Sequence, residues 1–230
     1  MQRIAVLTGA GISAESGIRT FRAADGLWEE HRVEDVASPQ GFQRNRALVQ
    51  RFYNARRAQL HDVAPNAAHR ALVELEATYH VDIITQNIDD LHERAGSTHV
   101  THLHGELRKA RSVKTGRAYP WTADITETDR CPDGGRLRPH VVWFGEAVPL
   151  IGTAAALVST ADVVLIIGTS MQVYPAAGLV GQARPRIPVY YVDPQPSINH
   201  ELRRAHALTV IEQTAVAGVP PLVAQLLERV

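Results

Sequence analysis

Short apolar runs that end in glycine or polar residues constrain the fold of this chain more than any other feature. Four such runs occur, at residues 4–7, 81–85, 163–167 and 187–192. Stretches with the apolar spacing of amphipathic helices lie between or after them, at residues 47–60, 67–79 and 219–227. Strands that alternate with helices form parallel sheets with helices on both faces. The pattern therefore predicts an α/β fold with a doubly wound, Rossmann-like parallel sheet.

Two irregular segments predict a small module appended to this sheet. Residues 108–139 are rich in turn formers, threonine, aspartate and arginine, and carry Tyr119 and Trp121 as large aromatic anchors. Residues 19–39 form a long connection, and long connections in compact domains are often functional. At 230 residues the chain has room for one main domain and such a module. We expect a large domain at 1–18, 81–107 and 140–230, with the module built from the insertions 19–80 and 108–139.

Charge and cysteine content restrict the partners and the compartment. The 24 Lys and Arg residues balance the 24 Asp and Glu residues, so we expect no nucleic-acid-coating surface. Cys131 is the only cysteine, which excludes an intramolecular disulfide and fits a reducing, cytoplasmic location. The apolar run at residues 4–7 is too short for a signal sequence or a membrane span. A cytoplasmic monomer without a membrane partner is the expectation.

A glycine-rich turn follows the first apolar run. It spans residues 9–17, with glycine at positions 9, 11 and 17, and should open a helix. Glycines let the backbone approach a pyrophosphate, and a helix N-terminus offers unpaired amides to an anion. The third glycine is not at the usual dinucleotide-binding spacing, so this turn alone also fits a plain connection between strand and helix.

Polar residues also follow two later runs, where open parallel sheets bind ligands. Residues 168–170, with the sequence Gly-Thr-Ser, follow the third run, and Asp193 follows the fourth. A carboxylate at this edge suits ribose hydroxyls. Because Pro194 comes next, Asp193 could equally begin a turn.

The second run is followed by Gln86, Asn87 and Asp89. The two amides offer donors and acceptors to a carboxamide or a ribose, and the carboxylate can orient a polar ring. Helix capping by Asn87 or Asp89 before residues 91–94 is the alternative interpretation.

The densest group of histidines lies at residues 99–104. In an extended segment His102 and His104 would share one face, so a metal site must be considered. No cysteine or carboxylate lies at a convincing third-ligand spacing. His104 precedes Gly105, as in a ring held exposed by a permissive turn, and the pKa range of histidine suits a general base.

Five sequence blocks occur in the order of the sirtuins, specifically the bacterial CobB-type deacylases, and the chain resembles that family. The blocks are GAGISAESGIRTFR, TQNIDDLH, HLHGE, RPHVVWFGE and GTSMQVYPAAG, and the resemblance extends from about residue 4 to residue 227. It implies an NAD-dependent protein lysine deacylase that acts on acylated lysine side chains. The implied products are nicotinamide, free lysine and O-acyl-ADP-ribose.

The resemblance also implies roles for individual residues. The expected NAD-binding residues are Gly9, Ala10, Gly11, Ile12, Glu15, Thr20, Phe21, Arg22, Gln86, Asn87, Asp89, His104, Gly168, Thr169, Ser170, Asp193 and Ala215. The expected catalytic residues are His104 and Asn87. A strip that pairs with the acyl-lysine peptide would consist of Val142, Trp143, Phe144 and Gly145. In the implied reaction the acyl oxygen attacks the ribose carbon as nicotinamide leaves, His104 removes a ribose hydroxyl proton, and Phe21 shields the ribose from water.

The FYNAR segment bears on the acyl group. Tyr53 and Arg56 lie three apart on a predicted helix and so can project from one face. An arginine on a helix is usually a solvated surface charge. These two residues, however, resemble the pair that marks the acidic-acyl, desuccinylase-like class III sirtuins, and Ala24 resembles the small residue that widens their acyl channel. A guanidinium binds a carboxylate through two parallel hydrogen bonds, so succinyl-lysine and malonyl-lysine are the expected substrates besides acetyl-lysine.

The chain departs from the family at two places. Most sirtuins bind a structural zinc through two cysteine pairs, whereas residues 110–114 contain no cysteine and only Cys131 remains in the second region. Four ligands cannot be assembled, so we predict no zinc and a module held by packing of Tyr119, Trp121 and Leu137. Asp193 stands where the family commonly has asparagine, and its charge would repel a 2′-phosphate, which favours NAD over NADP.

Two other functions remain open from the sequence. A protein ADP-ribosyltransferase could use the same fold and cofactor, although His104 and the pair formed by Tyr53 and Arg56 favour deacylation. A binding module that senses acyl-lysine or NAD without turnover is the second alternative, suggested by the missing cysteines.

Overall fold

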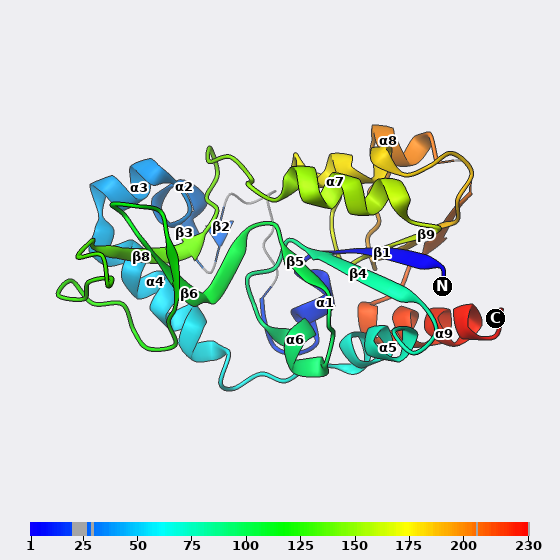
Figure 1. The fold of residues 1–230 in the computed structure, drawn as a ribbon, viewed down its shortest axis with the longest axis horizontal. Helices are drawn as coiled ribbons and strands as arrows, with labels where there is room; N and C mark the ends of the chain where they lie inside the picture. Colours follow the sequence, from blue (N-terminus) through cyan, green and yellow to red (C-terminus); the bar gives the residue numbers. More distant parts are fainter. Residues whose placement is uncertain (20–26, 29, 206, 230) are drawn as a thin grey trace.

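A six-stranded parallel sheet forms the centre of the protein (Figure 1). The computed structural model describes residues 1–19, 27–28, 30–205 and 207–229. Within the sheet the strands have the order β11, β10, β9, β1, β4, β5. Their bounds are β1 Arg3–Thr8, β4 His80–Thr85, β5 Val100–His102, β9 Val163–Ile167, β10 Val189–Val192 and β11 Leu208–Ile211. The four strands predicted from apolar runs are all present, and the predicted fold class is confirmed.

The order of the strands determines where a ligand can bind. From β1 the chain moves outward through β4 and β5 on one side, and later through β9, β10 and β11 on the other. The direction reverses between β1 and β9, which pair in parallel from Ile4 with Val163 to Thr8 with Ile167. Loops that leave neighbouring strands at such a switch point diverge and open a crevice. The loops after β1, β4 and β9 therefore meet at one edge of the sheet.

Helices cover both faces of the sheet (Figure 1). One face packs against α1 (Gly11–Ala14), α5 (Ala67–Leu75) and α9 (Ala215–Leu227). The other packs against α7 (Ile151–Thr160), the short 3-10 helix η2 (Ala176–Gln182) and α8 (His200–Arg203). Since the strands are buried on both sides, their continuously apolar sequence is explained. None of the helices in the described part of the chain is long and apolar enough to cross a membrane.

Two helix boundaries differ from those predicted by more than one residue. Helix α5 ends at Leu75 rather than at residue 79, because residues 76–79 continue as turns. Helix α9 begins at Ala215 rather than at residue 219. The Glu15 carboxylate accepts hydrogen bonds from Thr214 Oγ1 and Val216 N. It thereby satisfies a backbone amide in the first turn of α9 that has no partner within the helix. That contact joins residues about 200 positions apart, and local sequence could not reveal it.

A second body of structure lies to the left of the sheet in Figure 1. It contains α2 (Val33–Val36), α3 (Pro39–Arg44) and α4 (Arg46–Gln59), packed near a three-stranded antiparallel sheet. The strands of that sheet are β6 (Gly105–Ser112), β7 (Ala118–Pro120) and β8 (Leu137–Val141). The remaining elements are the pair β2 (Leu27–Trp28) and β3 (His31–Arg32), and helix α6 (Leu91–Ala95).

The division into a large domain and a small module remains a prediction, and one helix argues for a different boundary. Residues 67–75 were expected in the module, whereas Ala68, Leu72 and Leu75 of α5 are buried in the same core as β1 and β4. The apolar side of α5 faces α9 and the sheet. Residues up to 66 therefore form the better first insertion.

Polar side chains of α4 attach it to the antiparallel sheet. Gln50 Nε2 donates to the Leu137 carbonyl, and the Asn54 amide exchanges two hydrogen bonds with the backbone of Ile125. Arg57 is almost fully buried, and its Nε donates to the Leu107 carbonyl while Nη1 donates to Asn54 Oδ1. These residues are three and four positions apart, so they form one stripe on the helix.

The module has its own small core. Ala110, Ile125, Cys131 and Leu137 are buried, and the predicted anchors Tyr119 and Trp121 pack against them at the edge. In the part of the chain that the structure describes, no three His, Cys, Asp or Glu side chains are grouped as metal ligands. The available residues therefore do not fit the zinc site of the family.

Hydrogen bonds join the two turns where the family places its cysteine pairs. Ser112 Oγ donates to Asp133 Oδ1 at 3.1 Å, and Thr115 Oγ1 donates to the other oxygen of the same carboxylate. Ser112 Oγ also accepts from the amides of Lys114 and Thr115. A Cβ on Gly135 would lie 2.2 Å from Ser112 Oγ, so a side chain there would displace this hydroxyl from its hydrogen bonds.

Candidate active site

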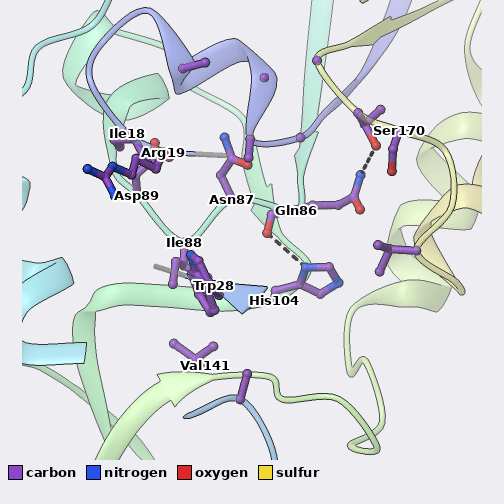
Figure 2. A pocket seen from close by; sticks show the side chains of 18 of the residues that line it. Ile18, Arg19, Trp28, Gln86, Asn87, Ile88, Asp89, His104, Val141 and Ser170 are labelled. Atoms are coloured by element: carbon purple, nitrogen blue, oxygen red, sulfur yellow. Dashed lines mark hydrogen bonds between the residues drawn. The ribbon is translucent and has the colours of Figure 1, made fainter. Parts of the chain in front are cut away.

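A cavity of about 590 Å³ lies at the carboxyl edge of the sheet, where the loops after β1, β4 and β9 meet (Figure 2). It brings together most of the site residues predicted from the sequence. Those that line it are Gly9, Ala10, Gly11, Glu15, Tyr53, Arg56, Gln86, Asn87, Asp89, His104, Val142, Trp143, Phe144, Gly145, Gly168, Thr169, Ser170 and Asp193.

Of the six other predicted site residues, two are described by the structure and do not line the cavity. The side chains of Ile12 and Ala215 are buried in the core between the sheet and α5 and α9, so their part in ligand binding is not supported. The other four lie outside the described residues: Thr20, Phe21, Arg22 and Ala24.

Three glycines allow the loops after β1 and β9 to touch. A Cβ on Gly9 would lie 2.7 Å from the Gly168 carbonyl oxygen, and one on Gly11 would lie 2.6 Å from Gly168 Cα. Gly168 itself has φ +60, and a Cβ there would lie 2.3 Å from the amide nitrogen of Ile12. Any side chain would push the loops apart, so these glycines serve the packing of the two loops as well as access to a ligand.

Two hydrogen-bonded amides build the polar wall. Gln86 Nε2 donates to Thr169 Oγ1 at 2.9 Å, which links the loops after β4 and β9. Asn87 Nδ2 donates to Ser13 Oγ at 3.2 Å, and Ser13 Oγ donates to Asp89 Oδ2 at 3.1 Å. The side chain of Asn87 is thereby tied to α1.

Asp89 is buried and has two roles. Burial raises the pKa of Asp89 to about 6, although hydrogen bonds from Leu91 N and Ser13 oppose the rise. Its Oδ1 accepts from Leu91 N at the start of α6, although the N-cap residue of that helix is Asp90, and Asp89 also lines the cavity.

The geometry of His104 suits a general base. Its Nδ1 donates to the Gln86 carbonyl at 3.0 Å, since a carbonyl oxygen can only accept. In the neutral ring Nε2 then carries the lone pair (Figure 2). Burial lowers the pKa of His104 and so favours this neutral form. Gly105 follows with φ +83, and a Cβ added there would lie 2.0 Å from the His140 carbonyl oxygen. Only glycine suits this backbone conformation and close contact, which explains the predicted permissive turn after His104.

His102 has the opposite environment. Strand β5 ends at His102, and both of its ring nitrogens face acceptors: the Asn87 carbonyl at 3.0 Å and Glu93 Oε1 at 2.7 Å. Burial alone would lower the pKa of His102, but the hydrogen bond and charge of Glu93 outweigh it and raise the pKa. The two histidines therefore do not converge on a shared ligand, and the described residues give the metal alternative no support.

The Tyr53 and Arg56 pair of α4 also lines the cavity. Tyr53 is fully buried, and its Oη accepts a hydrogen bond from Trp143 Nε1 at 3.0 Å. Burial also raises the pKa of Tyr53 well above its usual value. The Arg56 guanidinium lies 4.7 Å from the centre of the Phe52 ring. Its Nε and Nη1 are buried and have no hydrogen-bond partner among the described residues.

The predicted peptide strip is partly tied to its own chain. Val142 N donates to the His104 carbonyl at 2.8 Å, and Phe144 N donates to the Ala37 carbonyl at 3.0 Å. The side chain of Trp143 is buried, whereas that of Phe144 is 47% exposed. The strip thus holds His104 from one side while its outer face stays accessible.

Sequence reasoning missed a group of apolar and polar lining residues. They come from separate segments: Ile18, Arg19, Trp28, Ile88, Leu107, Val141, Tyr174, Gln195 and Thr214. In Figure 2, Ile88 and Trp28 lie to the left of His104, and Val141 lies below them. Only folding brings these side chains together, so no local spacing could have revealed them.

Comparison with known proteins identifies the family. The sequence model of the Sir2 family matches residues 9–175. An NAD-dependent protein deacylase of Helicobacter pylori strain 26695 is 51% identical over 229 residues, which cover 99% of each chain. The chain therefore belongs to the Sir2 family, and the resemblance to sirtuins is confirmed.

Solved structures agree with this assignment. A structure described as a Sir2 homolog–NAD complex is 36% identical, with a TM-score of 0.85, and the match covers 99% of this chain and 90% of that one. A structure described as Sir2 bound to acetylated peptide is 28% identical, with a TM-score of 0.77, and the match covers 98% and 92%.

Proposed function

We propose that this protein uses NAD to remove acidic acyl groups, succinyl and malonyl, as well as acetyl, from lysine side chains of proteins. The broader activity, NAD-dependent protein deacylation, follows from membership of the Sir2 family and from the relatives that carry this name. The acidic-acyl preference is carried by one observation: Arg56 lines the cavity, and two nitrogens of its guanidinium group, Nε and Nη1, are buried without a hydrogen-bond partner among the described residues.

The cavity fits a dinucleotide at its polar end. The contact between the glycines after β1 and β9 leaves backbone rather than side chains at the wall, where a pyrophosphate needs close approach. Gln86 and Asn87 present amides that suit a carboxamide or a ribose. Asp193 follows β10 and also lines the cavity, and its charge favours NAD over the 2′-phosphate of NADP.

The residues around His104 would move a proton. When bound, NAD supplies a ribose carbon whose bond to nicotinamide breaks as the acyl oxygen bonds to it. His104 Nε2 accepts the proton of a ribose hydroxyl, because Nδ1 is held by the Gln86 carbonyl and cannot do so. Asn87 is fixed by Ser13 and can orient the polar groups of the ligand. Ile88, Trp28 and Val141 exclude water from this end of the cavity.

The acyl end would accept a carboxylate. Arg56 and Tyr53 lie one turn apart on α4, and both line the cavity. A buried cationic group without a hydrogen-bond acceptor is unfavourable, so an incoming carboxylate gains both charge and hydrogen bonds there. An acetyl group gains neither. The preference for an acidic acyl group therefore follows from what Arg56 lacks in the free protein.

Substitution of Arg56 by methionine tests this proposal. We expect kcat/KM for a succinyl-lysine peptide to fall by about 100-fold, the effect of losing a charge-assisted hydrogen-bonded pair of about 3 kcal/mol, and that for the matched acetyl peptide to fall much less. Arg51→Met, on an exposed position of the same helix, is the matched control. Equal losses for the two peptides would contradict the selectivity role.

Product analysis separates deacylation from the other two functions. Incubation with NAD and an acylated peptide, followed by mass spectrometry, should show loss of the acyl group. Gain of ADP-ribose on the peptide would instead indicate a transferase. Absence of nicotinamide release in the presence of acyl-peptide would indicate a binding module without turnover.

A further inference from the structure

The contact between Trp143 and Tyr53 fixes the direction of a hydroxyl group. Trp143 Nε1 lies 3.0 Å from Tyr53 Oη, and both side chains are buried. An indole nitrogen can only donate a hydrogen bond, whereas a phenol oxygen can both accept and donate. Tyr53 is therefore the acceptor in this pair. The hydroxyl hydrogen cannot point at Trp143 and is available to another acceptor.

The protonation of Tyr53 strengthens this conclusion. Its burial raises the pKa of the phenol, so the hydroxyl keeps its hydrogen at neutral pH. Among the residues that the structure describes, Trp143 is the only hydrogen-bond partner of Tyr53 Oη. Since Tyr53 lines the cavity beside Arg56, a carboxylate bound to Arg56 is the natural acceptor for the remaining hydrogen.

The indole of Trp143 is held in place from several sides. The Arg138 guanidinium carbon lies 3.3 Å from the centre of the indole ring, and the Phe42 ring centre lies 5.1 Å away. Glu146 accepts hydrogen bonds from Arg138 Nη1 at 2.6 Å and from the backbone amide of Trp143 at 2.8 Å. One carboxylate thus fixes both the tryptophan backbone and the cation stacked on its ring.

We propose that Trp143 is a positioning residue for acyl selectivity: its indole N–H turns the Tyr53 hydroxyl toward the carboxylate of an acidic acyl group held by Arg56. This role rests on the proposed acidic-acyl activity and adds a residue that does not itself touch the carboxylate. Without the indole N–H, the Tyr53 hydroxyl would be free to rotate away from the acyl carboxylate.

Two peptides that differ in one charge provide the readout. One carries succinyl-lysine and the other carries its neutral monoamide, so size and shape are nearly equal. The ratio of their kcat/KM values measures recognition of the charge alone. Trp143→Phe should lower this ratio by about fivefold to tenfold, less than the full effect of one hydrogen bond to a charged group, because the Tyr53 hydroxyl is freed to rotate but not removed. Trp121→Phe removes an indole N–H that donates to the Asp124 carbonyl in the small module, and should leave the ratio at its wild-type value.

A double-mutant comparison tests whether Trp143 acts through Tyr53. In a Tyr53→Phe background the hydroxyl is gone, so Trp143→Phe should lower the ratio no further. Equal losses of activity on both peptides for Trp143→Phe would show a merely structural role and overturn the proposal. A further loss of the ratio in the Tyr53→Phe background would also overturn it.

Two more variants keep the outcome decisive. If Trp143→Phe does not fold, as judged by its melting transition, Arg138→Lys replaces it: lysine keeps the charge beside Glu146 but loses the flat face that holds the indole. The same ratio should then fall by about twofold to threefold, and an unchanged ratio would overturn the proposal. Arg56→Met distinguishes failure of the proposed acidic-acyl activity from failure of the positioning role. If Arg56→Met leaves the ratio unchanged, the acidic-acyl activity itself is refuted. If Arg56→Met lowers the ratio but Trp143→Phe does not, only the positioning role of Trp143 is refuted.

Discussion

Two histidines that lie two positions apart show how far environment decides chemistry. His104 gives one ring nitrogen to a carbonyl and keeps the other basic, and burial lowers its pKa. Both ring nitrogens of His102 face acceptors, and the hydrogen bond and charge of Glu93 raise its pKa. The HLHGE block predicted His104 correctly as the accessible ring because of Gly105. It could not predict the role of His102, since Asn87 and Glu93 reach that ring only through the fold.

The lowered pKa of His104 predicts the acid limb of the pH profile. The active form of the base is the neutral ring, and lowering the pKa keeps the ring neutral further into the acid range. We therefore expect kcat/KM for an acetyl peptide to decline with an apparent pKa below the ordinary histidine value of about 6.5. Initial rates from pH 5 to pH 9 at saturating NAD measure this limb. An apparent pKa above the ordinary value would contradict the assigned environment.

At the scale of elements, apolar spacing predicted α4 within one residue at each end but gave no account of its polar stripe. Gln50, Asn54 and Arg57 were part of the predicted helix, yet their partners are backbone groups of residues 107, 125 and 137. Sequence spacing shows that such side chains share a face. It cannot show that the face is covered by another element, and so a buried arginine was indistinguishable from a solvated one.

The hydrogen-bonded turns of the small module predict how it responds to metal removal and to mutation. Because the described residues offer no metal-binding group, treatment with a strong chelator should leave the melting temperature unchanged. Ser112→Ala should lower it by about 4 °C, since the amides of Lys114 and Thr115 lose their buried acceptor.

The control for this prediction is Ser159→Ala, which removes a hydroxyl from an exposed position of α7. Differential scanning calorimetry of both variants, with and without chelator, measures the effect. A fall in melting temperature on chelation, together with stoichiometric zinc in the purified protein, would show that a metal site forms after all.

At the scale of the whole molecule, the sequence predicted four of the six strands of the parallel sheet but not their order. The alternation of apolar runs and helices implied a parallel sheet, and the polar residues after each run implied a shared edge. The position of β1 between β9 and β4 decides which of those residues meet, and it depends on packing of α5 and α9 on one face and α7 on the other. The part of the cavity near Tyr53 and Arg56 was harder still to predict, because its lining comes from α4, β6 and the strip after β8.

A buried histidine pair predicts how the whole protein responds to acid. His69 of α5 and His92 of α6 lie in the interior with ring centres 4.9 Å apart. Burial lowers the pKa of His69 from 6.5 to about 4, and it lowers that of His92 well below its usual value. The unfolded chain therefore binds more protons than the folded one between pH 6.5 and pH 4, and the free energy of unfolding falls as the pH falls through this range. Asp89 acts in the opposite direction, because its pKa is raised.

Replacement of His69 by glutamine isolates this contribution from that of Asp89. Glutamine can keep the capping box at the start of α5, in which the His69 side chain accepts from the Asn66 amide, but it does not titrate. Between pH 7.5 and pH 5.0, His69 should lower the free energy of unfolding of the wild type by about 2 kcal/mol. The loss in the His69→Gln variant over the same range should be smaller than that of the wild type by this amount. Urea unfolding of both proteins at the two pH values measures the difference, in which the effect of Asp89 cancels. An equal loss of unfolding free energy in the two proteins would mean that His69 is hydrated or already protonated in the folded state. The core between the sheet and α5 would then be more open to water around His69 than the burial of this side chain indicates.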